Sequence, residues 1–293
     1  MAFHVVDNNT PKPKNKKPQK HRNPLKKRKN WFKRLAIAAG VLFVGFLVVL
    51  GAYKGYETWN VHQIEAQVSA NQKKDAKQRP KVATAATKFA NKDISFDQNA
   101  DIPDAQTLQK YRSLPEKLSF DGYISVPRQA GVSTPIQTLQ INEGVSNKVL
   151  AYGAGTLKPN QVMGAKDHNY AIAAHNVGYG GGKLMFSPMQ NGINVNAQPK
   201  AYLTDGRNIY VYQFNKESDS LSGRKVISYR NGGGVASDDV AKNQSVVTLV
   251  TCNEDGTWTN NPEKRIVMTA HLIEQVNKYD ASDFEKSLFP QIF

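Results

Sequence analysis

An uncharged apolar run at residues 35–53 is the feature that most restricts how this chain of 293 residues can fold. The run reads LAIAAGVLFVGFLVVLGAY, and as a helix it is long enough to span about 30 Å of hydrocarbon. Aromatic residues favour the headgroup level of a bilayer, and the chain places them before the run (Trp31, Phe32) and at or after its end (Tyr53, Tyr56, Trp59). The sequence therefore predicts a transmembrane helix.

The positive charge of the chain is concentrated before this run. Residues 1–34 contain nine Lys, three Arg and one acid, Asp7, so they carry +11 of the net +15. Cations before a membrane span place that side in the cytoplasm. We therefore expect a basic cytoplasmic tail at 1–34, an anchor at 35–53, and the remainder of the chain outside the cell. A basic tail can also bind nucleic acid, but attraction to anionic membrane lipid explains it without such a partner.

Two other interpretations of the apolar run are less consistent with the residues around it. A cleaved signal peptide is the stronger alternative, but the run is long for its apolar region and no A-x-A-like site lies in VVLGAYKGYETW. A buried core helix is the other, and core helices this apolar rarely adjoin twelve cations. We therefore interpret the run as an uncleaved anchor.

Residues 54–116 have the composition of a spacer. The first part is rich in helix formers, and Arg79-Pro80 is expected to end that helix. The part that follows shows no sustained hydrophobic period. We interpret 54–116 as an extracellular stalk, and a segment that docks on the following domain is the alternative.

From Ser119 the chain changes to short β-rich runs that are separated by turn residues. Eight strands are predicted, at 119–127, 133–142, 169–175, 200–206, 208–214, 224–230, 245–252 and 265–276. Strands at this spacing with only short helical turns, in TLKPNQVMG and KLMFSPMQNG, favour a mainly β fold and a closed antiparallel barrel. We assign this domain to 117–275 and a C-terminal tail to 276–293.

The chain has a single cysteine, Cys252, at the end of the strand SVVTLVTC and the start of a polar loop. It cannot form a disulfide within the chain, so it is a packed residue, an intermolecular link or a reactive thiol. A hairpin returns Arg265 to the strand beside it. A guanidinium there would favour a thiolate or hold an oxyanion, and a surface arginine beside a buried cysteine is the alternative.

A thiol nucleophile also needs an acid or base partner, and the chain has six histidines. His175 ends the predicted strand NYAIAAH before a Gly-rich loop, so its strand-end position matches that of Cys252. His168, in the polar loop AKDHN, is the second candidate, and His271 falls inside the last strand as a structural residue. The others lie in the predicted tail and stalk: His4, His21 and His62.

These motifs resemble those of the sortases, most closely the class A group. The matching residues are TLVTC, the arginine thirteen residues beyond its cysteine, and the upstream AIAAHN. The segments EGVSNKVLAYGAGTLKPNQVMGAKDHNYAIAAHN and LTDGRNIYVYQF also match, so the resemblance covers 117–275. Sortases of this group are membrane-anchored transpeptidases of Gram-positive bacteria. The resemblance implies an eight-stranded β-barrel and the catalytic set His175, Cys252 and Arg265.

The resemblance also implies a substrate and a reaction. Cys252 would attack the carbonyl between Thr and Gly of an LPxTG-type sorting signal, and an amine of a cell-wall peptidoglycan precursor would resolve the thioester. Substrate-binding candidates are Thr251, beside the nucleophile, and Trp258, a candidate wall of the groove. Two other classes stay open: a thiol hydrolase with water as acceptor, and a non-catalytic, membrane-tethered binding module in which Cys252 is packed.

Two comparisons with the family concern single residues. The family usually has Gly before the histidine, where this chain has Ala174. The added methyl group needs little room and an ordinary φ, so we expect a minor shift. Some class A members use calcium through acidic residues before the histidine, whereas GAKDHNY offers only Asp167. Ca²⁺ takes six to eight oxygen ligands, so we expect no calcium requirement and no other cofactor.

Overall fold

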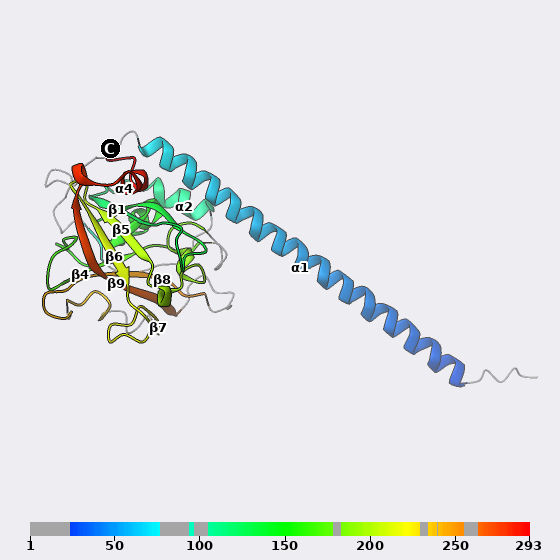
Figure 1. Cartoon of the computed structure of the whole chain (residues 1–293). Coiled ribbons are helices and arrows are strands. Elements are labelled where there is room, and N and C mark those ends of the chain that lie inside the picture. The colour runs from blue at the N-terminus through cyan, green and yellow to red at the C-terminus, as the bar shows by residue number, and fades with distance from the viewer. Residues whose placement is uncertain are drawn as a thin grey trace, which may run out of the picture. The chain divides into compact units, whose positions relative to one another are not determined.

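The structure is a computed structural model that describes residues 24–76, 94–96, 105–177, 183–228, 234–238, 240–254 and 263–293 (Figure 1). The chain divides into two compact units, Met1–Lys54 and Gly55–Phe293. The first unit contains the whole apolar run 35–53, and the second contains all the strands that the structure describes.

Helix α1 (Pro24–Ala76) is continuous through the predicted anchor. Within it, Trp31–Tyr56 is the one segment of the described residues that is long and apolar enough to cross a membrane. This segment includes the predicted span 35–53 and extends it at both ends. The helix continues into the region rich in helix formers and ends at Ala76, before Arg79-Pro80.

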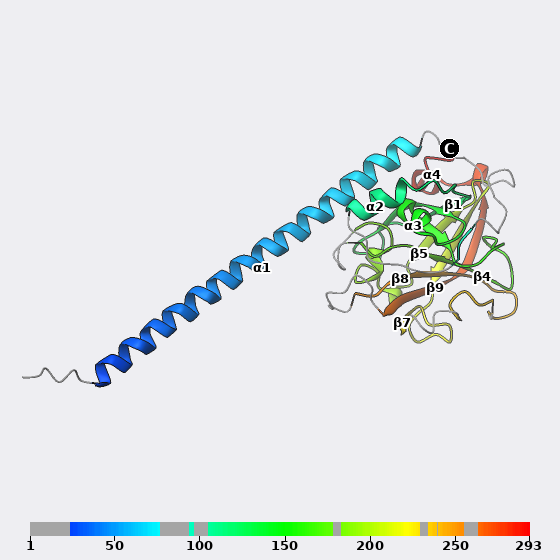
Figure 2. The ribbon, with the colours of Figure 1, turned by 180° about the vertical axis from the view of Figure 1, so that it is seen from behind.

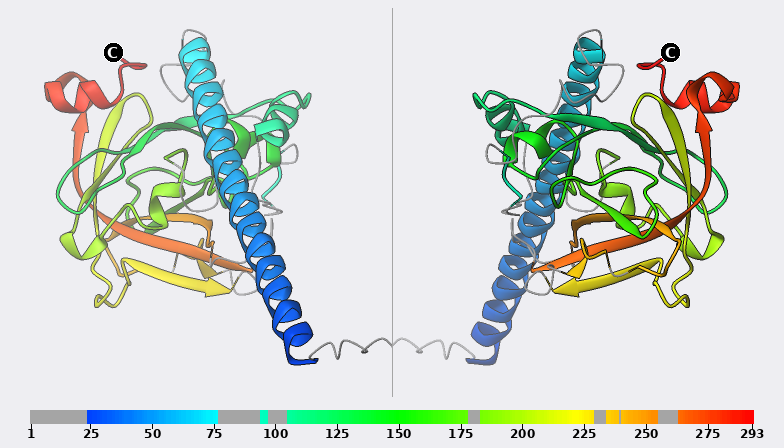
Figure 3. Two further views of the ribbon diagram at one scale, coloured as in Figure 1. Left: turned by 90° about the vertical axis from the view of Figure 1, so that its right-hand side faces the viewer. Right: turned by 90° about the vertical axis from the view of Figure 1, so that its left-hand side faces the viewer.

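Eight strands close into a barrel, as predicted (Figure 3). In order around the barrel, β6 pairs with β5, then β1, β2, β3, β4, β8 and β9, and β9 pairs with β6 to complete the ring. The strands are β1 (Phe120–Val126), β2 (Ile136–Asn142), β3 (Ala154–Thr156), β4 (His168–Ala173), β5 (Lys200–Thr204), β6 (Asn208–Phe214), β8 (Ser245–Cys252) and β9 (Lys264–Asn277).

The membership of the ring differs from the prediction at two strands. The predicted strand at 224–230 is β7 (Arg224–Ser228), which pairs only with the first half of β9 and lies outside the ring. The second half of β9 pairs with β6, so this long strand has room for both neighbours. The eighth ring strand is β3, which has three residues and was not predicted because so short a segment shows no alternation.

Two pairs in the barrel are parallel, so the prediction of an antiparallel barrel was wrong at these positions. They are β2–β3, joined through helix α3 (Asn147–Tyr152), and β4–β8, joined through β5, β6 and β7. Each of these two connections carries the chain back to the end of the barrel where the earlier strand began. The later strand of the pair therefore runs in the same direction as the earlier one. As a result, the C-terminal ends of β4 and β8 lie side by side at one end of the barrel.

The barrel wall formed by β4, β8 and β9 has two distinct faces. Its inner face packs into the main core through alternate residues, which are Tyr170, Ile172, Ala174, Val247, Leu249, Ile266, Met268 and Ala270. Its outer face contributes Ala171, Ala173, Val250 and Val267 to a separate apolar cluster, which also includes Val235 and Ala236 of the β7–β8 connection. Since side chains alternate along a strand, residues 175, 252 and 265 belong to the outer face.

The folded domain begins earlier than the predicted boundary at 117. Helix α2 (Ala105–Arg112) places Leu108 in the barrel core with 3% of its surface exposed. Arg112 Nε donates to Ala151 O at 2.9 Å, and α2 lies beside α3 (Figure 2). The stalk interpretation is therefore wrong for residues 105–112, which dock on the domain as in the alternative.

The C-terminal tail is also part of the domain. It contains the 3₁₀ turn η6 (Lys278–Asp280) and helix α4 (Asp283–Leu288), which begins at a capping box formed by Ser282 and Glu285. Beyond α4, Phe289 and Ile292 are buried in a second apolar cluster on the outer side of β1, β5 and β6. Two further 3₁₀ turns are η3 (Ser187–Met189), within a segment predicted to be helical, and η4 (Val195–Ala197).

Candidate active site

His175, Cys252 and Arg265 lie in a row across three neighbouring strands. The parallel register pairs Ala173 with Val250, and Ala174 N donates to Val250 O at 3.1 Å, so two residues further His175 lies beside Cys252. In the antiparallel pair β8–β9, Cys252 is directly opposite Arg265. Adjacent strands are about 4.8 Å apart, so the three side chains are close neighbours on the outer face.

The three side chains are almost completely shielded from water. His175 is 1% exposed, and Cys252 and Arg265 are each 3% exposed. A buried guanidinium remains charged, and one of its N–H groups, Nη1, donates to Lys264 O at 3.1 Å. A fixed positive charge in a site that excludes water acts strongly on its neighbours.

Within the described part of the chain, the imidazole of His175 is buried without a hydrogen bond to hold its protonation state. Neither ring nitrogen has a hydrogen-bond partner among the residues that the structure describes. Burial of the imidazole, and after it the positive charge of Arg265, together lower the pKa of His175 to about 4. At neutral pH the imidazole is therefore mainly neutral in the absence of a negative partner.

The sequence matches the model of the Sortase domain over residues 124–273, which is half of the chain. The chain belongs to the sortase family. Sortase A of Streptococcus agalactiae serotype III (strain NEM316) is 33% identical over 165 residues, which are 54% of this chain and 58% of that protein. Sortase A of Bacillus anthracis is 28% identical over 240 residues, which are 81% of this chain and 94% of that protein. The solved sortase A of Listeria monocytogenes has a TM-score of 0.45 at 26% identity, over 58% of this chain and 97% of that one.

Two other histidines of the barrel, His168 and His271, have partners of their own. His168 is at the opposite end of β4, seven residues from His175 and so roughly 23 Å away along the strand. Its Nδ1 is 3.4 Å from Asp238 Oδ1. His271 Nδ1 is 2.5 Å from Asn215 Oδ1, which confirms the predicted structural role. His175 is thus the histidine that the fold brings to Cys252.

Thr251 and Trp258 were the two predicted substrate-binding residues. Thr251 is on the inner face, and its hydroxyl donates to Ala174 O at 2.8 Å, which joins the ends of β8 and β4. Its role toward substrate stays a prediction, and Trp258 lies outside the described residues. The methyl group of Ala174 packs in the main core, and Ala174 is not among the described residues with a positive φ. The minor shift relative to Gly stays a prediction.

A polar network beside the row of three was not predicted from the sequence. Asn176 Nδ2 donates to Cys252 O at 3.0 Å, so Asn176 ties down the cysteine main chain and does not orient His175. Gln190, which follows η3, contacts Asn176, Asn253 and Glu254 through its side-chain amide. The sequence signal was weak: a glutamine directly after the apolar stretch LMFSPM.

The residues before His175 do not fit a calcium site. Asp167 Oδ1 accepts from Asn243 N at 2.5 Å, so this carboxylate already serves the main chain of another segment. Across the described part of the chain, no group of three or more His, Cys, Asp or Glu side chains is suited to hold a metal ion. The expectation that the sortase needs no calcium stays a prediction.

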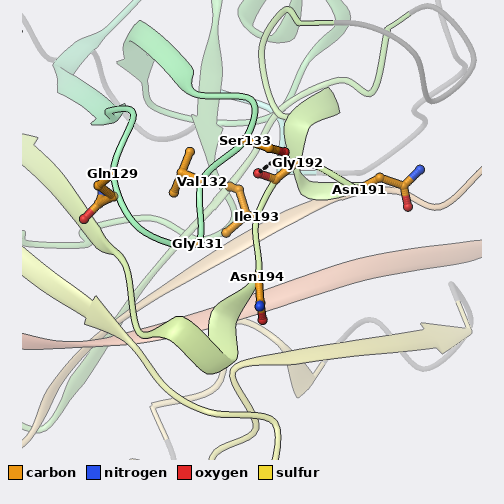
Figure 4. A pocket seen from close by; sticks show the side chains of 8 residues that line it. All are labelled: Gln129, Gly131, Val132, Ser133, Asn191, Gly192, Ile193 and Asn194. Carbon is orange, nitrogen blue, oxygen red and sulfur yellow. Dashed lines mark hydrogen bonds between the residues drawn. The ribbon is translucent and has the colours of Figure 1, made fainter.

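A hollow of about 410 Å³ lies between the β1–β2 connection and the segment that follows Gln190 (Figure 4). The two segments are joined by main-chain hydrogen bonds, with Ser133 N donating to Gly192 O at 2.9 Å and Asn194 N to Gly131 O at 2.7 Å. The hollow is lined by none of the three residues of the row. It therefore gives no reason to place the reaction there.

Proposed function

We propose that this sortase is a class A transpeptidase. In this proposal it cleaves an LPxTG-type sorting signal between Thr and Gly and joins the freed carboxyl group to an amine of a cell-wall peptidoglycan precursor. The observation that carries the proposal is the row of His175, Cys252 and Arg265, buried together at the ends of three strands. It supplies a nucleophile, a proton carrier and a fixed cation within reach of one carbonyl group.

In the first half of the reaction, the thiolate of Cys252 attacks the Thr carbonyl carbon and a tetrahedral oxyanion forms. The guanidinium of Arg265, on the next strand, stabilises this oxyanion; loss of such a donor typically costs about 3 kcal/mol in the transition state. The C–N bond then breaks, and the imidazolium of His175 gives its proton to the leaving glycine amine. A thioester on Cys252 remains.

In the second half, the amine of the acceptor attacks the thioester carbonyl. Neutral His175 takes a proton from the attacking amine, and the C–S bond breaks to return the thiolate of Cys252. The product is an amide that joins the surface protein to the precursor. The imidazolium and thiolate are restored together, so the enzyme is ready for another cycle.

The protonation state limits how much of the enzyme is active. Since burial and the cation of Arg265 both lower the pKa of His175, the imidazolium form needs the thiolate beside it. The active pair is accordingly a minority at neutral pH, and its two protons titrate as a coupled system. The dependence of rate on pH is expected to be bell-shaped.

The apolar segment Trp31–Tyr56 supports a single-pass membrane location. The basic residues before it favour a cytoplasmic N-terminus, which would put the barrel outside the cell, where LPxTG-bearing surface proteins and the precursor amine are met. Membrane lipid is then a partner of the tail and anchor, and no nucleic acid is required.

Product analysis tests the proposed reaction. The protein is incubated with an LPxTG-type peptide and an excess of triglycine, and the products are separated by mass. We expect an amide product that is lost in Cys252→Ala, while a free carboxylate despite ample amine would identify a thiol hydrolase. If neither product forms and iodoacetamide leaves Cys252 unmodified in the folded protein, Cys252 is a packed residue and the binding-module alternative holds.

A further inference from the structure

The two strand ends that carry Cys252 and His175 are joined by side chains as well as by the sheet. As a strand, β4 ends at Ala173 and β8 ends at Cys252. Beyond the main-chain bond from Ala174 to Val250, Thr251 and Asn176 each contribute a side-chain bond between the two ends. The relative position of the thiol and the imidazole thus depends on groups outside the regular ladder.

Gln190 uses every hydrogen-bonding position of its side-chain amide at this junction. Its Oε1 accepts from Asn176 Nδ2 and from Glu254 N, each at 3.1 Å. Its Nε2 donates to Asn253 Oδ1 and to Glu254 O, again at 3.1 Å each. An amide has one acceptor oxygen and two donor hydrogens, so these four bonds join the residue after His175 to the two residues after Cys252.

The chain that presents Gln190 is itself firmly held. Ser187, in η3, is 1% exposed, and its hydroxyl accepts from Val177 N at 2.7 Å and donates to Val177 O at 3.1 Å. Phe186 N donates to His175 O at 3.2 Å, and Gln190 N donates to Ser187 O at 3.0 Å. The amide of Gln190 therefore extends from a platform that is fixed to the main chain on either side of Asn176.

We propose that Gln190 is a positioning residue for the reaction of Cys252. By holding the main chain of 252–254 against Asn176, it keeps the thiol in line with His175 and Arg265. The inference rests on the proposed function, since it names a residue that supports the same site. Gln190 touches neither substrate nor the reacting atoms in this account, so its effect is on the geometry of the row.

Three variants of the full-length protein in detergent test this role. Gln190→Leu keeps the approximate size and removes all four bonds, whereas Gln190→Glu keeps the two that are accepted and loses the two that are donated. The matched control is Gln161→Leu. Gln161 is a buried glutamine, whereas Gln190 is partly buried, and it likewise binds main chain. Its Nε2 donates to Ala171 O of β4 at 2.8 Å, and Ala171 N donates to its Oε1 at 2.5 Å.

We expect Gln190→Leu to lower kcat for transfer of an LPxTG-type peptide to triglycine by about 10-fold to 100-fold, the scale of a misplacement of roughly 1 Å. KM for the peptide should stay within about twofold of the wild-type value. The kcat of Gln190→Glu should lie between those of Gln190→Leu and the wild type. Gln161→Leu should stay within about twofold of the wild-type kcat, even where it lowers the melting temperature equally. Equal loss of kcat in Gln161→Leu, or an unchanged kcat in Gln190→Leu, would reduce Gln190 to a stabilising residue of the fold.

A second readout separates this inference from the proposed function. The rate of Cys252 alkylation by iodoacetamide is measured against pH, together with hydrogen exchange at the Glu254 amide, and neither needs a sorting signal. Gln190→Leu is expected to shift the midpoint of alkylation, because the thiol moves relative to Arg265, and to speed exchange at Glu254, while Gln161→Leu does neither. If the wild type transfers no peptide, the proposed function fails, but these measurements still test the positioning role of Gln190. An unchanged midpoint of alkylation in Gln190→Leu would overturn that role.

Discussion

His175 shows how burial and charge set the chemistry of a single residue. Its imidazole is shielded from water beside a guanidinium and lacks a hydrogen-bond partner within the described residues. Both its burial and the charge of Arg265 favour the neutral form and lower its pKa to about 4. Arg265 has a double effect, since the same charge that opposes imidazolium favours the thiolate of Cys252 and the oxyanion of the proposed reaction.

Replacement of Arg265 by Lys tests whether this cation acts through its shape. Arg265→Lys keeps the charge but loses the planar fork that can point two N–H groups at one oxyanion. We expect kcat for peptide transfer to fall about 100-fold, the cost of one lost oxyanion donor, with the fold intact by circular dichroism. Arg207→Lys, at the exposed β5–β6 turn, is the control and should retain wild-type activity. A lysine variant at 265 with most of its activity would mean that charge alone suffices.

The lowered pKa of His175 also predicts how stability depends on pH. The pKa is about 4 in the folded protein and about 6.5 in the unfolded chain, so between these values the unfolded chain binds more protons. Stability is therefore lost as pH falls from 6.5 to 4. Relative to His175→Gln, the wild type should lose about 3 kcal/mol of unfolding free energy between pH 7 and 4, at 1.36 kcal/mol per pKa unit. Urea unfolding at both pH values measures this, and parallel losses in the two proteins would show that His175 is not buried in the neutral form.

At the scale of elements, the parts of the fold with a strong local pattern could be predicted from the sequence. The alternation in SVVTLVTC and NYAIAAH gave the two strands, and their ends gave Cys252 and His175. Three-residue β3 has too little pattern, and the parallel pairing of β4 with β8 is decided by chain connections rather than by residues near either strand. Gln190 was missed because its partners lie 14 and more than 60 residues away.

Helix α2 was misassigned to a stalk because one buried residue does not make a periodic pattern. Leu108 is the residue of this helix that enters the barrel core. Leu108→Ala should lower the free energy of unfolding by about 2–5 kcal/mol through the lost burial and the cavity left behind. Gln109→Ala changes the exposed neighbour on the same helix and should be nearly neutral. Equal effects of the two variants in a thermal unfolding experiment would place α2 off the domain.

At the scale of the whole molecule, the sequence separates into a charged tail, an apolar span and a globular barrel domain. The charge of +11 on residues 1–34 predicts that this tail is cytoplasmic. On intact protoplasts, an added protease should therefore cut within 54–293 and leave an epitope at the N-terminus untouched, and lysis should expose that epitope. Loss of the N-terminal epitope before lysis would reverse the proposed orientation.

In the proposed reaction, Cys252 becomes acylated by a sorting signal. The full-length protein is mixed with an LPxTG-type peptide without added amine, quenched in acid, digested, and examined by mass spectrometry. We expect the peptide up to its Thr to be held as a thioester on the fragment that contains Cys252. This adduct should be sensitive to hydroxylamine and absent in Cys252→Ala. An unmodified Cys252 fragment from a protein that nonetheless cleaves the peptide would contradict the proposed reaction, because cleavage would then proceed without the thiol nucleophile.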